Sequence, residues 1–342
     1  MPFSRLVFRL ALFVFVPILL VMVVWSLLPF RGDVLIFSAY LEDHYSVFTL
    51  DIDRHIIHTV TPFNGNVYNP RWSPDGEQIA FVYGRDIYVS DASGRYAYNL
   101  TNTREIITNT LPVWSPDGAH IAFVSDRVGQ QNLFVMDRNG ENVRNLTPEL
   151  EVRNAPIWSP DSTQLLLNVN DGTESQMVRV TFETGEIAGF EGAGEVVGGI
   201  AWSPDGSQLA YLRWNDRTFQ LVVEDISTGD TQIIHDSINT TSLPHWSPDS
   251  TKLTYVISIQ NGQRIVYVRD LRDNDDKELF GFGLTRNIII ESPRWSPDGE
   301  RIAFLSNHES LTALYTISTR GGGLERISPA NLSLVSDPQW RP

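Results

Sequence analysis

Trp72-Ser73-Pro74-Asp75-Gly76 is the first copy of a motif that recurs to the end of the chain. Further copies follow at intervals of 42 to 49 residues, two of them with serine in place of glycine and the last one degenerate. Their tryptophans are Trp72, Trp114, Trp158, Trp202, Trp246, Trp295 and Trp340. A period of about 40 to 50 residues is typical of propellers built from four-stranded blades. The repeat therefore predicts an all-β propeller.

Each repeat has the same internal pattern, which is clearest after Trp114. Ser-Pro-Asp-Gly favours a tight turn, because proline fixes φ and glycine takes positive φ easily. Three more strands are predicted after the turn, at 121–124, 132–136 and 143–147. Two repeats carry Ser162 and Ser250 at the glycine position. A left-handed backbone there costs about 1 kcal/mol for a residue other than glycine.

The two ends of the chain are predicted to share one blade. Three strands, at 34–37, 46–50 and 56–60, precede the first motif without a tryptophan strand before them. The missing fourth strand is the one around Trp340. Pairing the last strand with the first closes a ring and protects the sheet edges. We therefore expect a seven-bladed β-propeller, with six blades as the alternative.

The combination of Trp-Ser-Pro-Asp-Gly, Ile-Ala-Phe and Leu-Thr in each repeat resembles the TolB-type β-propeller, a WD-repeat-like unit. The resemblance covers about residues 34–342 and does not include the separate α/β domain that precedes the propeller in TolB. Such propellers occur in bacterial envelope proteins and in peptidases of the prolyl-oligopeptidase type. The resemblance is highly specific for the fold and weakly specific for function.

An apolar run at residues 10–30 follows Arg5 and Arg9 and contains no charge. As a helix it would span the hydrocarbon core of a bilayer, which is about 30 Å thick. A cleaved signal peptide is the alternative, but the run exceeds the usual apolar length and lacks a small-x-small cleavage site. We therefore expect an uncleaved signal anchor. The positive-inside rule then places residues 1–9 in the cytoplasm and the propeller, residues 31–342, outside it.

The charge balance excludes several classes of function. The 342 residues include 26 Lys or Arg against 41 Asp or Glu, a net charge of -15, and no cysteine. A surface this acidic repels phosphate backbones, so we expect no nucleic-acid partner. Disulfides and thiolate metal sites are impossible without cysteine.

The repeated polar and aromatic residues have structural explanations. The aspartate of each motif occupies a turn position, where a short carboxylate accepts hydrogen bonds from backbone amides. The tryptophan recurs once per blade and is expected to pack between neighbouring sheets. No Gly-x-Ser-x-Gly, Walker, His-Glu-x-x-His or dinucleotide motif occurs in the sequence. We therefore predict no catalytic residue, no cofactor and no metal site.

Three candidate binding residues come from the positions just before the tryptophans. Those positions lie on the strand nearest the central channel. Arg71, His245 and Arg294 are expected to present positive groups at its mouth. Ion pairing with nearby acids, such as Glu291 and Asp337, is the alternative.

Trp214 is the fourth candidate, since it lies outside the repeat, in Arg213-Trp214-Asn215-Asp216-Arg217, where two arginines flank it. A flat aromatic ring beside arginine suits stacking on a sugar or a peptide side chain, or covering a blade edge.

Three classes of function follow from these features. The first is a non-enzymatic, membrane-tethered propeller that binds a protein or peptide partner in the cell envelope, that is, the periplasm. The second is a sensor of a glycan or small ligand at the channel mouth. The third is a propeller enzyme, such as a polysaccharide lyase or hydrolase.

Overall fold

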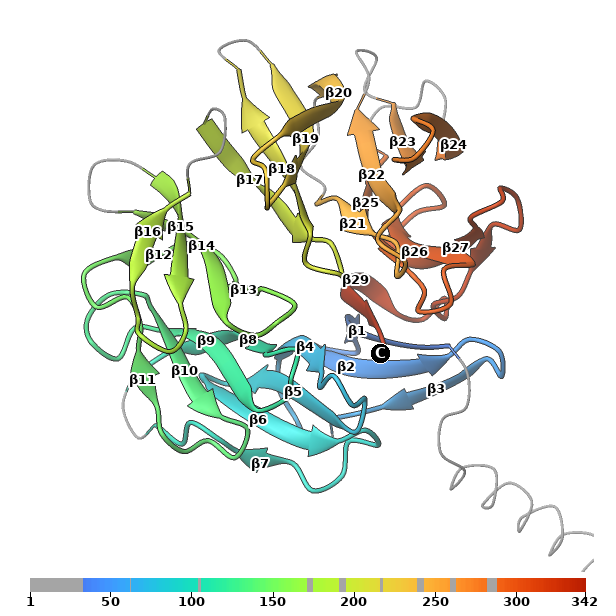
Figure 1. The fold of residues 1–342 in the computed structure, drawn as a ribbon. Helices are drawn as coiled ribbons and strands as arrows, with labels where there is room; N and C mark the ends of the chain where they lie inside the picture. The colour runs from blue at the N-terminus through green and yellow to red at the C-terminus, as the bar shows by residue number, and fades with distance from the viewer. Residues whose placement is uncertain are drawn as a thin grey trace, which may run out of the picture. The chain divides into compact units, whose positions relative to one another are not determined.

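The structure, a computed structural model, shows seven antiparallel sheets arranged as blades in a ring (Figure 1). It describes residues 33–61, 63–103, 106–170, 175–190, 195–215, 218–238, 243–258, 263–281 and 288–342. The predicted seven-bladed propeller is confirmed, and the six-bladed alternative is wrong. The anchor expected at residues 10–30 lies outside the described residues. Within them, no helix has the length and apolar character needed to cross a bilayer.

Blades 1 to 3 have four strands each. Blade 1 consists of β29 (Ser333–Trp340), β1 (Val34–Leu41), β2 (His44–Asp51) and β3 (Ile56–Thr59). Blade 2 consists of β4 (Val67–Trp72), β5 (Gln78–Tyr83), β6 (Asp86–Asp91) and β7 (Tyr98–Asn99). Blade 3 consists of β8 (Asn109–Trp114), β9 (His120–Ser125), β10 (Asn132–Asp137) and β11 (Arg144–Asn145).

Blades 4 to 7 repeat this plan, with one interruption. In blade 4 the inner position is divided between β12 (Glu151–Val152) and β13 (Ile157–Trp158), followed by β14 (Gln164–Asn170), β15 (Ser175–Thr181) and β16 (Ile187–Gly189). Blade 5 consists of β17 (Glu195–Trp202), β18 (Gln208–Trp214), β19 (Phe219–Asp225) and β20 (Thr231–Ile238). Blade 6 consists of β21 (His245–Trp246), β22 (Lys252–Ser258), β23 (Arg264–Asp270) and β24 (Asp275–Gly281). Blade 7 consists of β25 (Ile290–Trp295), β26 (Arg301–Ser306), β27 (Ala313–Ser318) and β28 (Glu325–Arg326).

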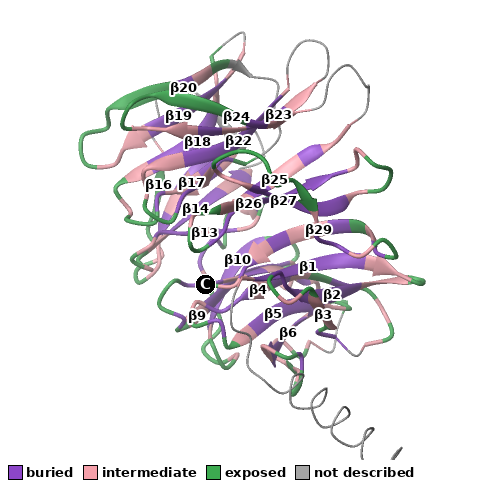
Figure 2. Cartoon of the chain, turned by 90° about the vertical axis from the view of Figure 1, so that its right-hand side faces the viewer, coloured by how far each residue is buried: buried purple, intermediate pink, exposed green. Residues whose placement is uncertain are grey.

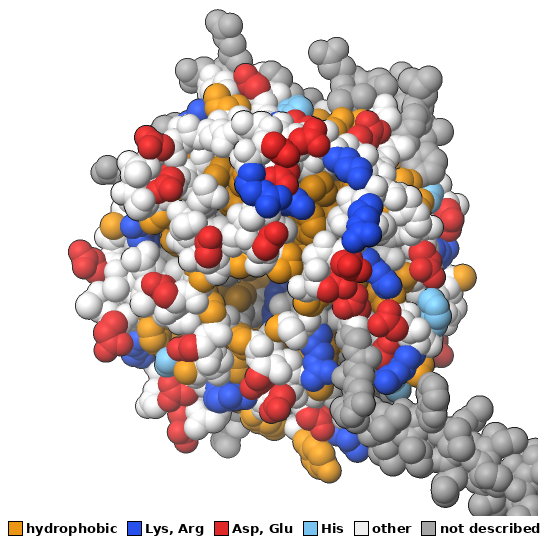
Figure 3. Space-filling view, turned by 45° about the vertical axis from the view of Figure 1, so that its right-hand side comes forward, with side chains coloured by type: hydrophobic (Ala, Val, Ile, Leu, Met, Phe, Trp, Pro, Cys, Tyr) orange, Lys and Arg blue, Asp and Glu red, His pale blue; other side chains and the backbone are white. Residues whose placement is uncertain are grey.

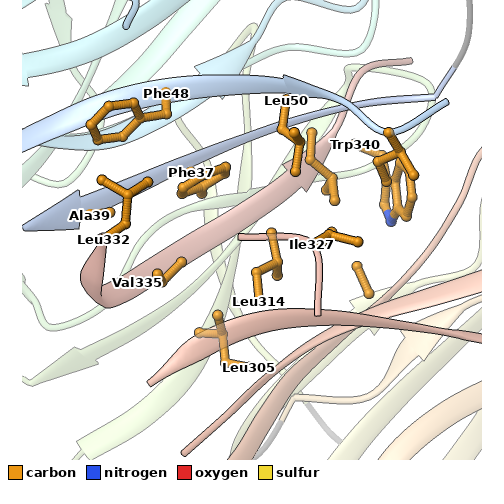
Figure 4. Packing of buried hydrophobic residues seen from close by; sticks show 13 residues of the cluster. Phe37, Ala39, Phe48, Leu50, Leu305, Leu314, Ile327, Leu332, Val335 and Trp340 are labelled. Carbon is orange, nitrogen blue, oxygen red and sulfur yellow. The ribbon is translucent and has the colours of Figure 1, made fainter. Parts of the chain in front are cut away.

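The chain ends close the ring as predicted. β29 pairs with β1 in antiparallel register, with Leu35 opposite Trp340 and Tyr40 opposite Ser333. Buried side chains of blades 7 and 1 form one cluster, in which Leu314 and Trp340 lie on the two sides of the junction (Figure 4). On the other side of blade 1, the Trp72 amide donates to Gln339 Oε1 at 3.0 Å. The last strand therefore holds blade 1 to both of its neighbours.

The outer strand of blade 3 is shorter than the prediction of 143–147. β11 covers only Arg144–Asn145, because the next residues replace ladder pairing with a side-chain bond. Leu133 N donates to Thr147 Oγ1 at 2.8 Å. Ile87 N donates to Thr101 Oγ1 at 3.0 Å in blade 2, so the Leu-Thr pair ends the strand in the same way there.

The turn aspartates have the predicted structural role. Asp75 Oδ1 accepts the Glu77 amide at 3.0 Å, and Asp117 Oδ1 accepts the Ala119 amide at 2.9 Å. Ser162 takes the predicted left-handed conformation at φ 62°. Its hydroxyl accepts the Asp117 amide of the preceding blade at 3.1 Å. This hydrogen bond offsets the backbone strain of a serine at a glycine position.

The motif tryptophans pack between blades, also as predicted. The indole nitrogen of Trp158 donates to the Val113 carbonyl at 3.3 Å, and that of Trp246 donates to the Ala201 carbonyl at 2.9 Å. Each acceptor belongs to the residue just before the tryptophan of the preceding blade. Buried residues follow the inner and middle strands, while exposed residues gather on turns and outer strands such as β20 (Figure 2). Trp158 and Trp246 thus fix both the stacking of their blades and the backbone that borders the channel.

Candidate functional site

The innermost strands carry a β-bulge beside the channel. The residue three positions before the tryptophan has positive φ in several blades: Asn69 at 51°, Leu111 at 53°, Gly199 at 66°, Ser292 at 54° and Asp337 at 54°. The strand register shifts at the same places. A β-bulge changes the direction of a side chain and often lies next to a functional site.

The channel encloses a cavity of about 720 Å³. Its wall divides into two arcs, which we define by the residue just before each tryptophan. The polar arc runs over blades 6, 7, 1 and 2 and consists of His245, Arg294, Gln339 and Arg71. The apolar arc runs over blades 3, 4 and 5 and consists of Val113, Ile157 and Ala201. Figure 3 shows a hollow in one face of the molecule with hydrophobic and basic side chains in it. The cavity therefore has one polar and one apolar side, although all seven blades share the same fold.

Three of the four predicted binding residues meet in this cavity, and the fourth does not. Arg71 of blade 2, His245 of blade 6 and Arg294 of blade 7 line it together, and blade 1 lies between blades 7 and 2. Trp214 ends β18, half-buried, and its ring lies 4.8 Å from that of Phe219 on β19. It is absent from the cavity lining. Trp214 therefore lies apart from the three candidate residues at the channel.

The two arginines lie deep in the protein while keeping part of their surface open to the channel. Burial, opposed by the charge of Asp337, lowers the pKa of Arg71. Burial and then the positive charge of Arg71 lower the pKa of Arg294 to about 10. Both groups remain charged at neutral pH. Two guanidinium groups thus influence each other across blade 1.

His245 stays neutral in this setting. Burial, and then the charge of Arg294, lower its pKa to about 3. The Trp295 amide lies 3.4 Å from His245 Nδ1, which accepts its hydrogen. A neutral imidazole that accepts at Nδ1 carries its proton at Nε2. His245 is therefore a neutral donor, and the positive charge that we predicted for it from the sequence is wrong at neutral pH.

Asp337 is the acidic residue of the cavity, which the sequence suggested only as an ion-pair partner. It lies on the bulge of β29 and borders the cavity with both arginines. Among the described residues, neither arginine has an ion pair with it within 4 Å. Glu291, the other acid considered, does not line the cavity. Among the described residues, Asp337 thus acts on both arginines through its charge without a closed ion pair to either of them.

The low pKa of His245 predicts an acid-sensitive fold. An unfolded histidine has a pKa of about 6.5, so below that pH only the unfolded chain takes up the proton and stability falls until about pH 3. A His245→Gln variant lacks this titration. Between pH 8 and pH 5.5 the free energy of unfolding of the native chain should therefore fall by about 1 kcal/mol more than that of the variant. Urea unfolding of both proteins at several pH values measures this. Parallel stability curves over that range would contradict the assignment.

Comparisons with known proteins agree with the fold. The sequence pattern of the TolB beta propeller domain matches residues 25–191 and 193–342. A stretch of 51 residues is 45% identical to the uncharacterized peptidase YuxL of Bacillus subtilis (strain 168), which is 15% of this chain and 8% of that protein.

Two solved structures illustrate the range of similar propellers. TolB from Acinetobacter baumannii has a TM-score of 0.56 at 20% identity, and the match covers 74% of this chain and 65% of that chain. An oligogalacturonate lyase from Vibrio parahaemolyticus has a TM-score of 0.65 at 15% identity, covering 80% and 83%. At such identities the likeness shows the fold alone. The sequence pattern, in contrast, covers nearly the whole chain, and the protein therefore belongs to the TolB β-propeller family.

Proposed function

We propose that this protein is a non-enzymatic binding propeller that holds a peptide or protein segment of a cell-envelope partner in its central channel. The observation that supports the proposal most is the two-sided wall of the cavity. A peptide segment offers both apolar side chains and polar groups, and the apolar and polar arcs provide surfaces for each. We also propose that residues 10–30 tether the propeller to the membrane, with the propeller outside the cytoplasm.

The closed ring suits such a role. Blade 1 is bonded to blade 2 and packed on blade 7, so the residues around the channel are held by a rigid scaffold. A preorganised site loses less conformational entropy when a ligand binds. Its strained bulge residues, such as Ser292 and Asp337, are held in place by the surrounding sheets.

Partner capture tests the proposal. The tagged full chain in lipid nanodiscs is incubated with an envelope extract of the source organism, next to an Ala201→Phe variant that fills the channel from the apolar arc. We expect a protein captured by the native chain and at least about tenfold less capture by the variant, which corresponds to about 1.4 kcal/mol. Ala188→Phe on the exposed strand β16 is the matched control and should capture as much as the native chain.

Two results would contradict the proposal. One is capture of nothing above background by the native chain. The other is equal capture by the native chain and the Ala201→Phe variant, which would move binding to another surface of the propeller.

A further inference from the structure

The guanidinium groups of the channel have unused hydrogen-bond donors. Each arginine has five N–H donors in a planar fork. Arg71 Nη1 donates to the Pro70 carbonyl at 2.8 Å, and Arg294 Nη1 donates to the Pro293 carbonyl at 3.4 Å. Among the described residues, no other hydrogen bond of these two side chains is found. The fork of each arginine therefore keeps donors for a group that enters the channel.

The charges around these donors do not cancel. Arg71 and Arg294 contribute two positive charges, Asp337 contributes one negative charge, and His245 is neutral at pH 7. One further negative charge would balance the set. A dianionic phosphate would exceed this balance, whereas one carboxylate matches it and also matches the fork geometry of a guanidinium.

Gln339 adds a donor between the two arginines. It belongs to blade 1, which lies between blades 7 and 2, and it borders the cavity. Its Oε1 already accepts the Trp72 amide at 3.0 Å. Its side-chain NH₂ group is therefore the part left to meet a ligand.

The apolar arc, opposite the arginines, determines which chemical group of the ligand lies beside its anionic group. Val113, Ile157 and Ala201 face the channel from blades 3 to 5, and none of them carries a polar side chain. A ligand that spans the cavity therefore meets donors on one side and aliphatic side chains on the other.

We propose that the channel holds a carboxylate of the bound peptide between Arg71 and Arg294, with an apolar side chain of the same peptide against the apolar arc. This inference rests on the proposed peptide-binding function and names the chemistry of the peptide. The carboxylate belongs to a C-terminus or to an acidic side chain that has an apolar residue beside it.

Calorimetric titration of the full chain in uncharged lipid nanodiscs tests the inference with three probes. The first is N-acetylated Ala-Val-Ala with a free C-terminal carboxylate, the second is the same peptide as its C-terminal amide, and the third is butyrate. We expect the free acid to bind at least about tenfold more tightly than the amide, because charge-assisted hydrogen bonds to arginine are lost in the amide. Butyrate should bind about tenfold more weakly than the peptide acid, since it lacks the rest of the peptide.

Variants of the polar arc locate the site. Arg71→Gln and Arg294→Gln should each weaken binding of the peptide acid about tenfold and leave binding of the amide unchanged. Arg320→Gln is the matched control, because the Arg320 side chain is 88% exposed on the turn before β28. It should bind both peptides as the native chain does.

Asp337→Asn is a sharper variant because its expected effect has the opposite sign. It removes the negative charge that competes with the ligand, so the peptide acid should bind several-fold more tightly. Asparagine also tolerates the positive φ of this position. A variant that merely failed to fold would lose affinity rather than gain it.

The outcomes separate the two proposals. Equal affinities for the acid and the amide, or no binding of either at millimolar concentration, would overturn the carboxylate site. Those results would leave a captured protein partner as support for the proposed function. Butyrate binding as tightly as the peptide acid, with the same response to Arg294→Gln, would support the carboxylate site and contradict the peptide-binding function.

Discussion

Replacing Trp340 with alanine is expected to lower the free energy of unfolding by about 3 to 5 kcal/mol, the cost of emptying a large aromatic site in a core. Trp340 is only 6% exposed and belongs to the cluster that joins blades 7 and 1 (Figure 4). Its indole nitrogen also donates to the Arg294 carbonyl at 3.1 Å. The substitution therefore removes packing and a hydrogen bond at the junction that closes the ring. Urea unfolding of the full chain, followed by tryptophan fluorescence and circular dichroism, measures the loss.

Trp214→Ala is the control for this experiment, since it removes the same side chain from a half-buried position. Trp214 contacts Phe219 within its own hairpin, and none of the buried clusters found among the described residues contains it. We expect a loss of about 1 kcal/mol or less there.

A further consequence distinguishes the two variants. Weakening β29 exposes the edge of β1, so the Trp340→Ala variant should also aggregate at lower denaturant concentration. Equal losses of stability in both variants would mean that ring closure does not depend on Trp340.

The propeller could be predicted from the sequence because every blade repeats the same local signals. Proline and glycine mark the turn of the motif, and Asp75 shows why the aspartate recurs, since it accepts the Glu77 amide. The closure by β29 followed from counting strands at the two ends of the chain. Such features depend on period and turn chemistry, which are local properties of a sequence.

The chemistry of the channel was predictable only in part. The positions of Arg71 and Arg294 followed from their place before a tryptophan, but the neutral state of His245 depends on its burial and on Arg294, which a sequence does not show. The positive φ of Asp337 was not predictable either, because a left-handed aspartate at a β-bulge has no sequence signal as strong as a glycine. Whether Trp214 shares a site with the channel residues was not predictable, because spacing along the chain does not show which end of a hairpin faces the channel.

Replacing Gly94 with alanine is the second change for which we expect a large effect, a loss of about 3 to 4 kcal/mol of stability. Gly94 lies in the turn between β6 and β7 at φ 77°. A Cβ added there would lie 1.8 Å from the Val60 carbonyl oxygen of blade 1, so the backbone of one blade has to move. The cost combines a left-handed backbone, about 1 to 2 kcal/mol, with overpacking, typically about 1 to 3 kcal/mol. Urea unfolding of the full chain measures it.

Gly84→Ala separates the two parts of that cost. Gly84 takes a similar φ of 64° in the turn between β5 and β6, but no atom lies within 4 Å of an added Cβ. Its substitution should therefore cost only about 1 to 2 kcal/mol, the backbone part alone. Equal losses of stability in both variants would mean that the close approach of the β6–β7 turn to Val60 adds nothing to the cost and that the stacking of blades 1 and 2 does not depend on it. If only Gly94→Ala is strongly destabilised, stacking of neighbouring blades depends on a glycine that the Trp-Ser-Pro-Asp-Gly motif does not contain.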